Sequence, residues 1–317
     1  MMQTGSVGQI TGLRNRLSHS LLEKVAGPDG TEQTRRIHAT PGPRWFAKGA
    51  PIRVVHGDAS MYIGGMRALL LQALHPLAMA AVDDHSDYRA NTWGRLARTA
   101  TYIAETTYGT IEHAERAIRI VQAVHKRVHG TTVDGRPYRA DDPHLLTWVH
   151  VAEIDSFLVA HERFGSQSLT PRQYDEYVAQ AGEVATRLGA VDVPTTRAEL
   201  TAAIEAFRPE LEGTPGAADV AQFLLRHAPL PRPIKPAYWL LGRAAVATLP
   251  RWTREPLRVP DHPRRDRTTA LLGGRVGTAG IRWLTTAEPM QHPVPPPDPE
   301  SAPPAADQPD PQPQESR

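Results

Sequence analysis

Residues 111–130 read IEHAERAIRIVQAVHKRVHG and decide the fold class, because their pattern is helical. Apolar side chains recur at spacings of three and four residues, which places them on one face of a helix: Ala114, Ala117, Ile118, Val121, Val124 and Val128. His125 falls in the centre of this face, so the pattern predicts a helix over 111–129 with the His125 imidazole directed into the core. His113 falls on the charged side of the same helix, with Glu112 and Arg116.

The same spacing continues along the chain and predicts an all-α, multi-helix fold, because no stretch sustains the alternation of a half-buried strand. Thr92 and Thr110 suit helix N-caps, and Pro143 and Pro171 suit first turns. Glycines at 109, 130, 165 and 189 suit helix C-termini, and residues 131–142 are rich in turn formers. The expected helices are 59–82, weakened or kinked at His75-Pro76, and 92–108, 111–129, 143–164, 171–188, 197–206, 216–227 and 235–248.

Composition divides the chain into three parts. Residues 291–317 contain ten prolines and almost no large apolar side chain, which predicts a disordered tail. Residues 27–51 are rich in Gly, Pro and Arg and are expected to be extended. We therefore expect an N-terminal extension over 1–51, a single helical domain over 52–290 and the tail over 291–317.

The overall composition excludes several classes of protein. A net charge of +2 gives no case for nucleic-acid binding. The absence of cysteine excludes disulfides, thiolate metal sites and a thiolate nucleophile, so any iron must be bound by imidazole. Residues 1–27 lack the apolar run of a signal peptide, and the most apolar stretch, 68–82, is too short to span a bilayer. A cytoplasmic enzyme without a transmembrane segment is expected.

The histidines suggest two kinds of metal site. For each of them, a purely structural role of the histidine remains an open alternative. An inward His125 needs a partner, which is either iron or a backbone carbonyl. His125 and His129 have the spacing of a two-histidine chelate, but neither His-Glu-x-x-His nor Glu-x-x-His occurs, so zinc-protease and di-iron sites lack their carboxylates. Nucleotide-binding loops and the Gly-x-Ser-x-Gly elbow are also missing.

Residues 92–108 carry a polar stripe beside an apolar one. The stripe consists of Arg95, Thr99, Tyr102 and Thr106. It is either solvated or the wall of a pocket for an anion or dioxygen, in which Arg95 pairs with a carboxylate and Thr99 donates a hydrogen bond.

Two long segments resemble the MpaB/rubber oxygenase family, which includes the latex clearing proteins. They are GGMRALLLQALHPLAMAAVDDHSDYRANTWGRLARTATYI (64–103) and AERAIRIVQAVHKRVHGTTVDGRPYRADDPHLLTWVHVAEIDSFLVAHERFG (114–165), followed more loosely by FRPEL (207–211) and LPRPIKPAY (230–238). The family element Arg-x-x-x-Thr matches Arg95 and Thr99, and its His-x-x-Val-x-Gly element matches His125. His129 matches no ligand position of the family.

The resemblance implies a b-type haem in a globin-like helical core, with iron bound by His125 and with Arg95 and Thr99 beside the cofactor. It also implies an oxygenase that uses dioxygen on a small lipophilic, unsaturated substrate. The other matching elements are expected to serve as pocket or packing residues: His75-Pro76, Asp84-His85-Ser86, Asp142-Pro143, Trp148 and His150. For His85 the expectation is a distal haem contact or a loop role, and for His150 a buried hydrogen-bonded ring rather than a second axial ligand.

One departure from the family limits the substrate. The rubber oxygenases use a distal glutamate as a base, whereas this chain has no glutamate between residues 33 and 104. Asp83 and Asp84 are the nearest carboxylates. Polyisoprene is therefore not the expected substrate. The alternatives to an oxygenase are a non-catalytic protein that binds haem or a lipophile, and a purely structural helical partner with a basic, Pro-rich surface.

Overall fold

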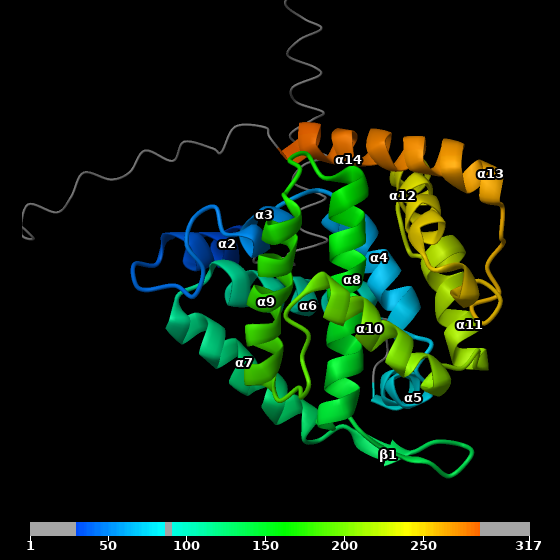
Figure 1. Ribbon diagram of the computed structural model, residues 1–317, viewed down its shortest axis with the longest axis horizontal. Helices are drawn as coiled ribbons and strands as arrows, with labels where there is room; N and C mark the ends of the chain where they lie inside the picture. Colours follow the sequence, from blue (N-terminus) through cyan, green and yellow to red (C-terminus); the bar gives the residue numbers. More distant parts are fainter. Residues whose placement is uncertain (1–29, 86–90, 286–317) are drawn as a thin grey trace, which may run out of the picture.

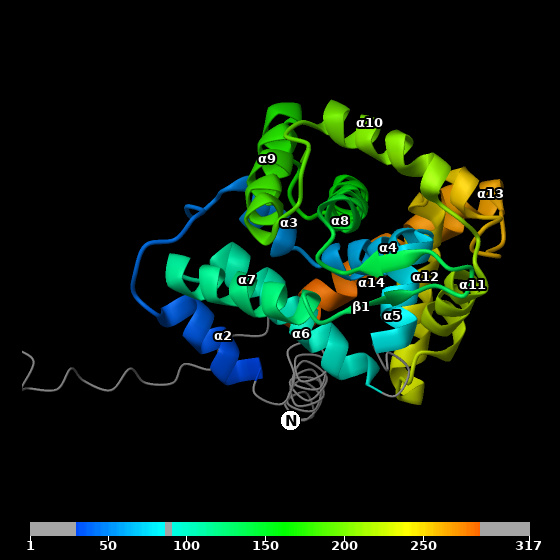
Figure 2. The same ribbon diagram turned by 90° about the horizontal axis from the view of Figure 1, so that it is seen from below.

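The computed structural model describes residues 30–85 and 91–285, and its centre is helix α8 (Pro143–Phe164). α8 stands upright in Figure 1 and is seen nearly end-on in Figure 2, ringed by other helices. It packs against α4 (Met61–Gln72), α9 (Pro171–Leu188) and α10 (Arg197–Phe207). Most of its side chains are buried, and Trp148 is among the largest that are fully enclosed. The all-α class predicted from the sequence is confirmed.

Local capping fixes the ends of these central helices. Asp142 accepts a hydrogen bond from the Leu145 amide at the start of α8, where Pro143 occupies the first turn as predicted. α9 begins with a capping box between Thr170 and Gln173. The expected helices 143–164 and 171–188 agree with the observed bounds to the residue.

The segment predicted as one helix over 59–82 forms two separate helices. The bend at His75-Pro76 is therefore larger than the kink that the sequence predicted. α4 ends at Gln72, and α5 (Pro76–His85) begins after a break at an angle of 103°. Pro76 lacks the amide proton that a continuing helix needs and disfavours a helical conformation at His75. Within the described residues, no single helix is long and apolar enough to cross a membrane, and this bent pair meets the criterion only when its two halves are taken together.

Two adjacent glycines of α4 give a test of this packing. A Cβ on Gly64 would lie 2.8 Å from Phe157 Cδ1 and 3.2 Å from Phe157 Cα on α8, whereas a Cβ on Gly65 would meet nothing within 4 Å. We expect Gly64→Ala to destabilise the protein by about 1–3 kcal/mol through overpacking. Gly65→Ala should stabilise it by about 0.5–1 kcal/mol through helix propensity. Urea unfolding followed by circular dichroism measures both, and equal effects of the two changes would contradict the close approach of α4 and α8.

The N-terminal part of the described chain is more helical than expected. Residues 27–51 were predicted to be extended, but α2 (Gly30–Ala39) lies within them, followed by α3 (Pro51–His56). α2 packs on α6 (Thr92–Tyr108), and Arg36 forms an ion pair with the buried Glu105 of α6. This tertiary contact stabilises a helix that composition alone did not predict.

α6 and α7 (Ile111–His125) form an antiparallel hairpin. Asn91, not the predicted Thr92, caps α6, whereas Thr110 caps α7 as predicted. α7 ends at His125 rather than at residue 129, because the chain turns into strand β1 (His129–Thr131), which pairs with β2 (Pro137–Arg139). Gly130 is therefore not a helix terminus: it lies opposite Tyr138, and a Cβ there would be 2.5 Å from the Tyr138 hydroxyl oxygen.

The C-terminal part of the domain packs on the far side of α4. It contains α11 (Pro215–Gln222), which continues as a π-helical turn over Phe223–His227, then α12 (Lys235–Thr248), the short α13 (Pro263–Arg265) and α14 (Leu271–Thr285). The sequence predicted α12 but not α14. Four glycines weaken the helix propensity of α14, but three of them allow close contacts: Gly273 with Leu240, Gly274 with Phe164 and Ala244, and Gly277 with Leu241.

An ion pair holds α14 across the top of the molecule in Figure 1. Arg282 donates to both carboxylate oxygens of Asp58, which also accepts hydrogen bonds from Ser166 and from the Ser60 amide. Burial would raise the pKa of Asp58, but these donors outweigh it and hold the pKa below its usual value. The pair therefore connects α14 to the start of α4 and to the end of α8.

Candidate functional site

Arg95 and Thr99 lie in the first half of α6, and His125 is the last residue of α7. Arg95 lies 13 residues before the end of α6, and His125 lies 14 residues after the start of α7. At a rise of 1.5 Å per residue, each lies roughly 20 Å along its own helix from the connecting turn. Thr99 follows Arg95 by one turn. Arg95 and His125 are half-buried, whereas Thr99 is exposed.

His125 is half-buried rather than fully directed into the core as predicted, and Val124 of the predicted apolar face is exposed. Its Nδ1 atom is nonetheless buried and has no hydrogen-bond partner within the described chain. Desolvation lowers the pKa of His125, against an opposing effect of Asp141, so the ring is neutral at neutral pH. A neutral imidazole with an unpaired nitrogen is the form that binds a metal ion.

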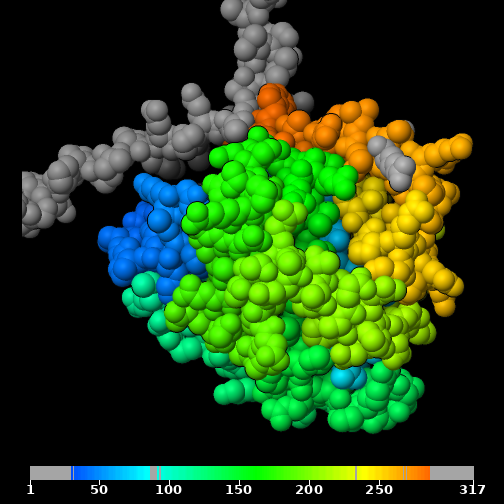
Figure 3. Space-filling view, in the orientation of Figure 1, coloured from blue at the N-terminus to red at the C-terminus, as the bar shows by residue number. Residues whose placement is uncertain are grey.

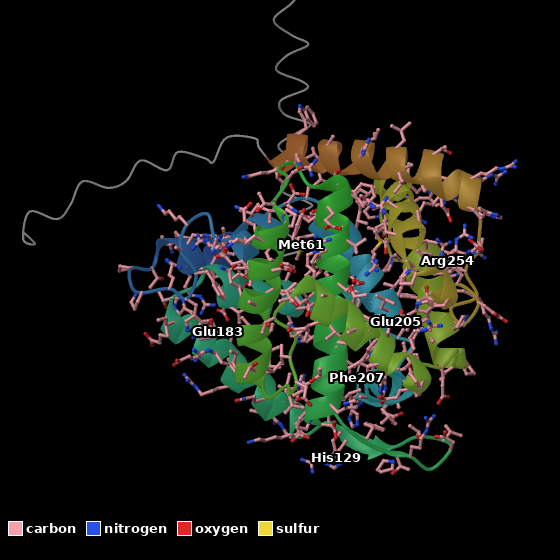
Figure 4. All side chains as sticks on the ribbon, viewed as in Figure 1. Met61, His129, Glu183, Glu205, Phe207 and Arg254 are labelled. Atoms are coloured by element: carbon pink, nitrogen blue, oxygen red, sulfur yellow. The ribbon has the colours of Figure 1, made fainter. Side chains whose placement is uncertain are left out.

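The second candidate, His129, lies outside the helical face altogether. It belongs to β1 and is exposed, at the lower edge of the molecule in Figure 4. The predicted spacing of one helical turn between His125 and His129 therefore does not exist, because α7 ends at His125. The helical geometry on which the two-histidine chelate was based is therefore absent.

His85 is tied to the β-hairpin. Its Nε2 lies 3.1 Å from the Tyr138 hydroxyl and 3.1 Å from the carbonyl oxygen of His129, and the Tyr138 hydroxyl donates to Asp84. Burial, together with the Asp84 carboxylate, raises the pKa of Tyr138 to about 12. These contacts support the structural role considered for His85. Ser86 of the same sequence element lies outside the described residues.

Glu153 of α8 is a candidate that the sequence analysis missed. It is half-buried and has no hydrogen-bond or ion-pair partner in the described residues, and burial raises its pKa to about 7. Burial and the negative charge of Glu153 both raise the pKa of Tyr102 on α6 and of Tyr177 on α9. Glu153 therefore lies within electrostatic reach of Tyr102, one member of the polar stripe of α6.

Two histidines accompany Glu153. His150 lies one helical turn earlier on α8 and is buried. Its Nε2 has no partner in the described part of the chain, so the expected hydrogen bond to that atom is absent. Burial lowers the pKa of His150 to about 4. His56 of α3 lies 2.9 Å from the Thr107 hydroxyl through Nδ1 and 3.3 Å from the Tyr177 hydroxyl through Nε2. Burial lowers the pKa of His56 to about 3. Both rings are neutral, so neither offsets a charge on Glu153.

Other histidines with unpaired nitrogens are better explained by packing. His75 is buried at the break between α4 and α5, with its ring 6.2 Å from that of Trp148 and its Nε2 3.5 Å from Glu210. His113 was expected on the charged side of α7 but is half-buried with Nδ1 unpaired. The error arises because α7 packs against both α6 and α9, so its buried face is wider than the apolar stripe.

No group of three or more His, Cys, Asp or Glu side chains suited to a metal ion occurs among residues 30–85 and 91–285. His75 and His144 share the carboxylate of Glu210, whereas the unpaired Nδ1 of His125 has no such neighbour among the described residues. A porphyrin supplies the equatorial nitrogen ligands of its iron and needs one axial imidazole from the protein. The unpaired, neutral ring of His125 fits that requirement.

The chain belongs to a family of oxygenases. Residues 53–283 match the family described as ER-bound oxygenase mpaB/B'/rubber oxygenase, catalytic domain. This match covers the described helical domain from α3 to α14, including the α6–α7 hairpin and Glu153. No curated protein and no solved structure matched the chain. The family assigns the protein to the oxygenases, and the resemblance noted in the sequence is confirmed.

Proposed function

We propose that this oxygenase uses a b-type haem and dioxygen to attack a carbon–carbon double bond of a lipophilic substrate. The observation that supports this proposal is the state of His125, a neutral imidazole with a buried unpaired nitrogen at the open end of the α6–α7 hairpin. When bound, haem would supply the iron centre that activates dioxygen. His125 would hold the iron.

The reaction consistent with these groups is oxidative cleavage. One dioxygen molecule provides both oxygen atoms, the carbon–carbon double bond breaks, and each of its carbons becomes a carbonyl carbon. Atoms and electrons balance without an external reductant, so the proposal requires no electron-transfer partner.

The side chains around the hairpin have distinct roles in this proposal. Arg95 would pair with a haem carboxylate, as guanidinium groups do, and Thr99 would donate a hydrogen bond beside it. Half-buried apolar side chains of α4 and α5 would contact the substrate: Leu69, Leu77 and Val82. Glu153, with a pKa near 7, would accept and return a proton at its carboxylate during turnover.

Product analysis tests the reaction. The purified, haem-loaded protein is incubated with an isoprenoid and with an unsaturated fatty acid, under ¹⁸O₂ and under nitrogen. We expect carbonyl products that carry the label and form only under oxygen. Haem binding without any labelled product from either class of substrate would reject cleavage and favour a haem-binding or lipophile-binding role.

A further inference from the structure

Positive charge is concentrated in the C-terminal part of the domain. Residues 235–285 contain ten Lys and Arg against three Asp and Glu, a net charge of +7 in a chain whose total is +2. The yellow and orange atoms of this segment lie together along one side of the molecule in Figure 3. One of its three acids, Asp266, is buried in an ion pair with the buried Arg254, so this pair leaves the net charge of the segment unchanged.

The outer face of α14 is apolar as well as basic. Leu272, Val276 and Trp283 are 64%, 58% and 50% exposed and share this face at helical spacing, with the exposed Arg275 among them. α14 contains no acidic residue. Neighbouring α12 adds Trp239, which is 55% exposed and has the Arg243 guanidinium over its ring. Exposed apolar side chains are usually scattered singly, so their clustering on two packed helices indicates a contact surface.

Among residues 30–85 and 91–285, the inner side of α14 is the one that packs against the domain. This inner side packs on α12 and α8 through Gly273, Gly274 and Gly277, and Arg282 fixes the helix to Asp58. The helix is therefore held with Leu272 and Val276 directed away from the domain. Arg264 and Arg265 of α13 are exposed just before it.

We propose that the surface formed by α12, α13 and α14 docks on an anionic lipid membrane. An interfacial helix needs an apolar face that enters the lipid, cations that meet the anionic headgroups, and tryptophan at the boundary. This surface provides all three. A nucleic acid would bind the cations but would not contact the exposed apolar side chains of Leu272 and Val276. The apolar stripe therefore favours a lipid membrane as the partner. Docking would place the domain beside membrane-dissolved molecules, although the proposal does not depend on the reaction catalysed.

Vesicle sedimentation of the full-length protein tests the proposal. We expect binding to vesicles that contain phosphatidylglycerol, weaker binding to pure phosphatidylcholine, and partial release by high salt. Leu272→Glu should weaken binding at least about tenfold by removing apolar burial. Arg264→Glu with Arg265→Glu should weaken it by at least about 30-fold. Matched controls are Val133→Glu, on the exposed β-hairpin loop, and Arg163→Glu, on α8, which should bind as the wild type does.

Three results would overturn the proposal. The first is a wild-type protein that does not sediment with phosphatidylglycerol vesicles. The second is equal binding by the test variants and their controls, with circular dichroism showing that all are folded. The third is a wild-type dimer in light scattering that Leu272→Glu converts to a monomer without changing vesicle binding, because the stripe would then be a contact between two copies of the chain.

Discussion

Replacing His125 with alanine should abolish stable haem binding. If His125 is the axial ligand, the variant purified from haem-supplied cells loses the Soret band or shows it displaced. Changing a residue that only supports a metal ligand typically costs about 10–100-fold in affinity, so removing the ligand itself should cost more than about 100-fold. The measurement is an absorption spectrum together with a haem titration of the apoprotein.

His129→Ala is the matched control for this change. His129 follows His125 by four residues but is exposed on β1, so its removal should leave the spectrum unaltered. Circular dichroism should show that both variants retain the helical fold, because truncating a half-buried ring at the end of α7 removes little packing. A His125→Ala protein with the wild-type spectrum and affinity would show that another histidine, with His150 the leading candidate, binds the iron.

Replacing Glu153 with glutamine should lower turnover by about 100-fold or more, the range expected for loss of a group that transfers protons. Burial raises the pKa of Glu153 to about 7, so the carboxylate needed as a base is present above that pH and is lost below it. The wild-type rate should therefore rise with pH through about 7, and the variant should lack this rise. Titration by infrared spectroscopy should show a carboxyl band that disappears over the same range in the wild type and is absent from the variant.

The stability of the protein provides a second readout for Glu153. A carboxyl whose pKa is raised on folding binds its proton more tightly in the folded state, so the free energy of unfolding falls as pH rises from the unfolded value of about 4.5 to about 7. Glu153→Gln should remove this fall. Glu162→Gln, an exposed position on the same helix, is the control and should retain both the pH profile and the wild-type rate. Unchanged turnover and pH dependence in Glu153→Gln would exclude a proton-transfer role.

Helices with local signals at both ends were predictable from the sequence. Residues 92–108, 143–164, 171–188 and 235–248 agree with the observed helices because caps, first-turn prolines or apolar periodicity mark them. α14 was not, because its glycines read as helix breakers until the neighbouring side chains that occupy their space are known. The strands were also missed, since a three-residue pair gives too short an alternation to be recognised.

The sequence suggests candidate residues where a motif relates them along the chain, and it does not suggest those that folding brings close from distant segments. Arg95, Thr99 and His125 were predicted because a motif and helical spacing relate them in sequence, and their roles remain a proposal. Glu153 was missed because a base was sought between residues 33 and 104, whereas α8 brings it near Tyr102 from another part of the chain. Its sequence signal was a carboxylate in a long helix whose other residues are mostly apolar. Only the packing of α8 shows that this carboxylate is desolvated.

Titration of the purified wild-type apoprotein with haem tests the central claim most directly. If the His125 ring accepts iron at the end of the α6–α7 hairpin, an intense Soret band should grow and saturate at one equivalent of haem per chain, and dioxygen should alter the spectrum of the reduced protein. A folded protein that shows no saturable band would contradict the proposed cofactor, and with it the proposed function.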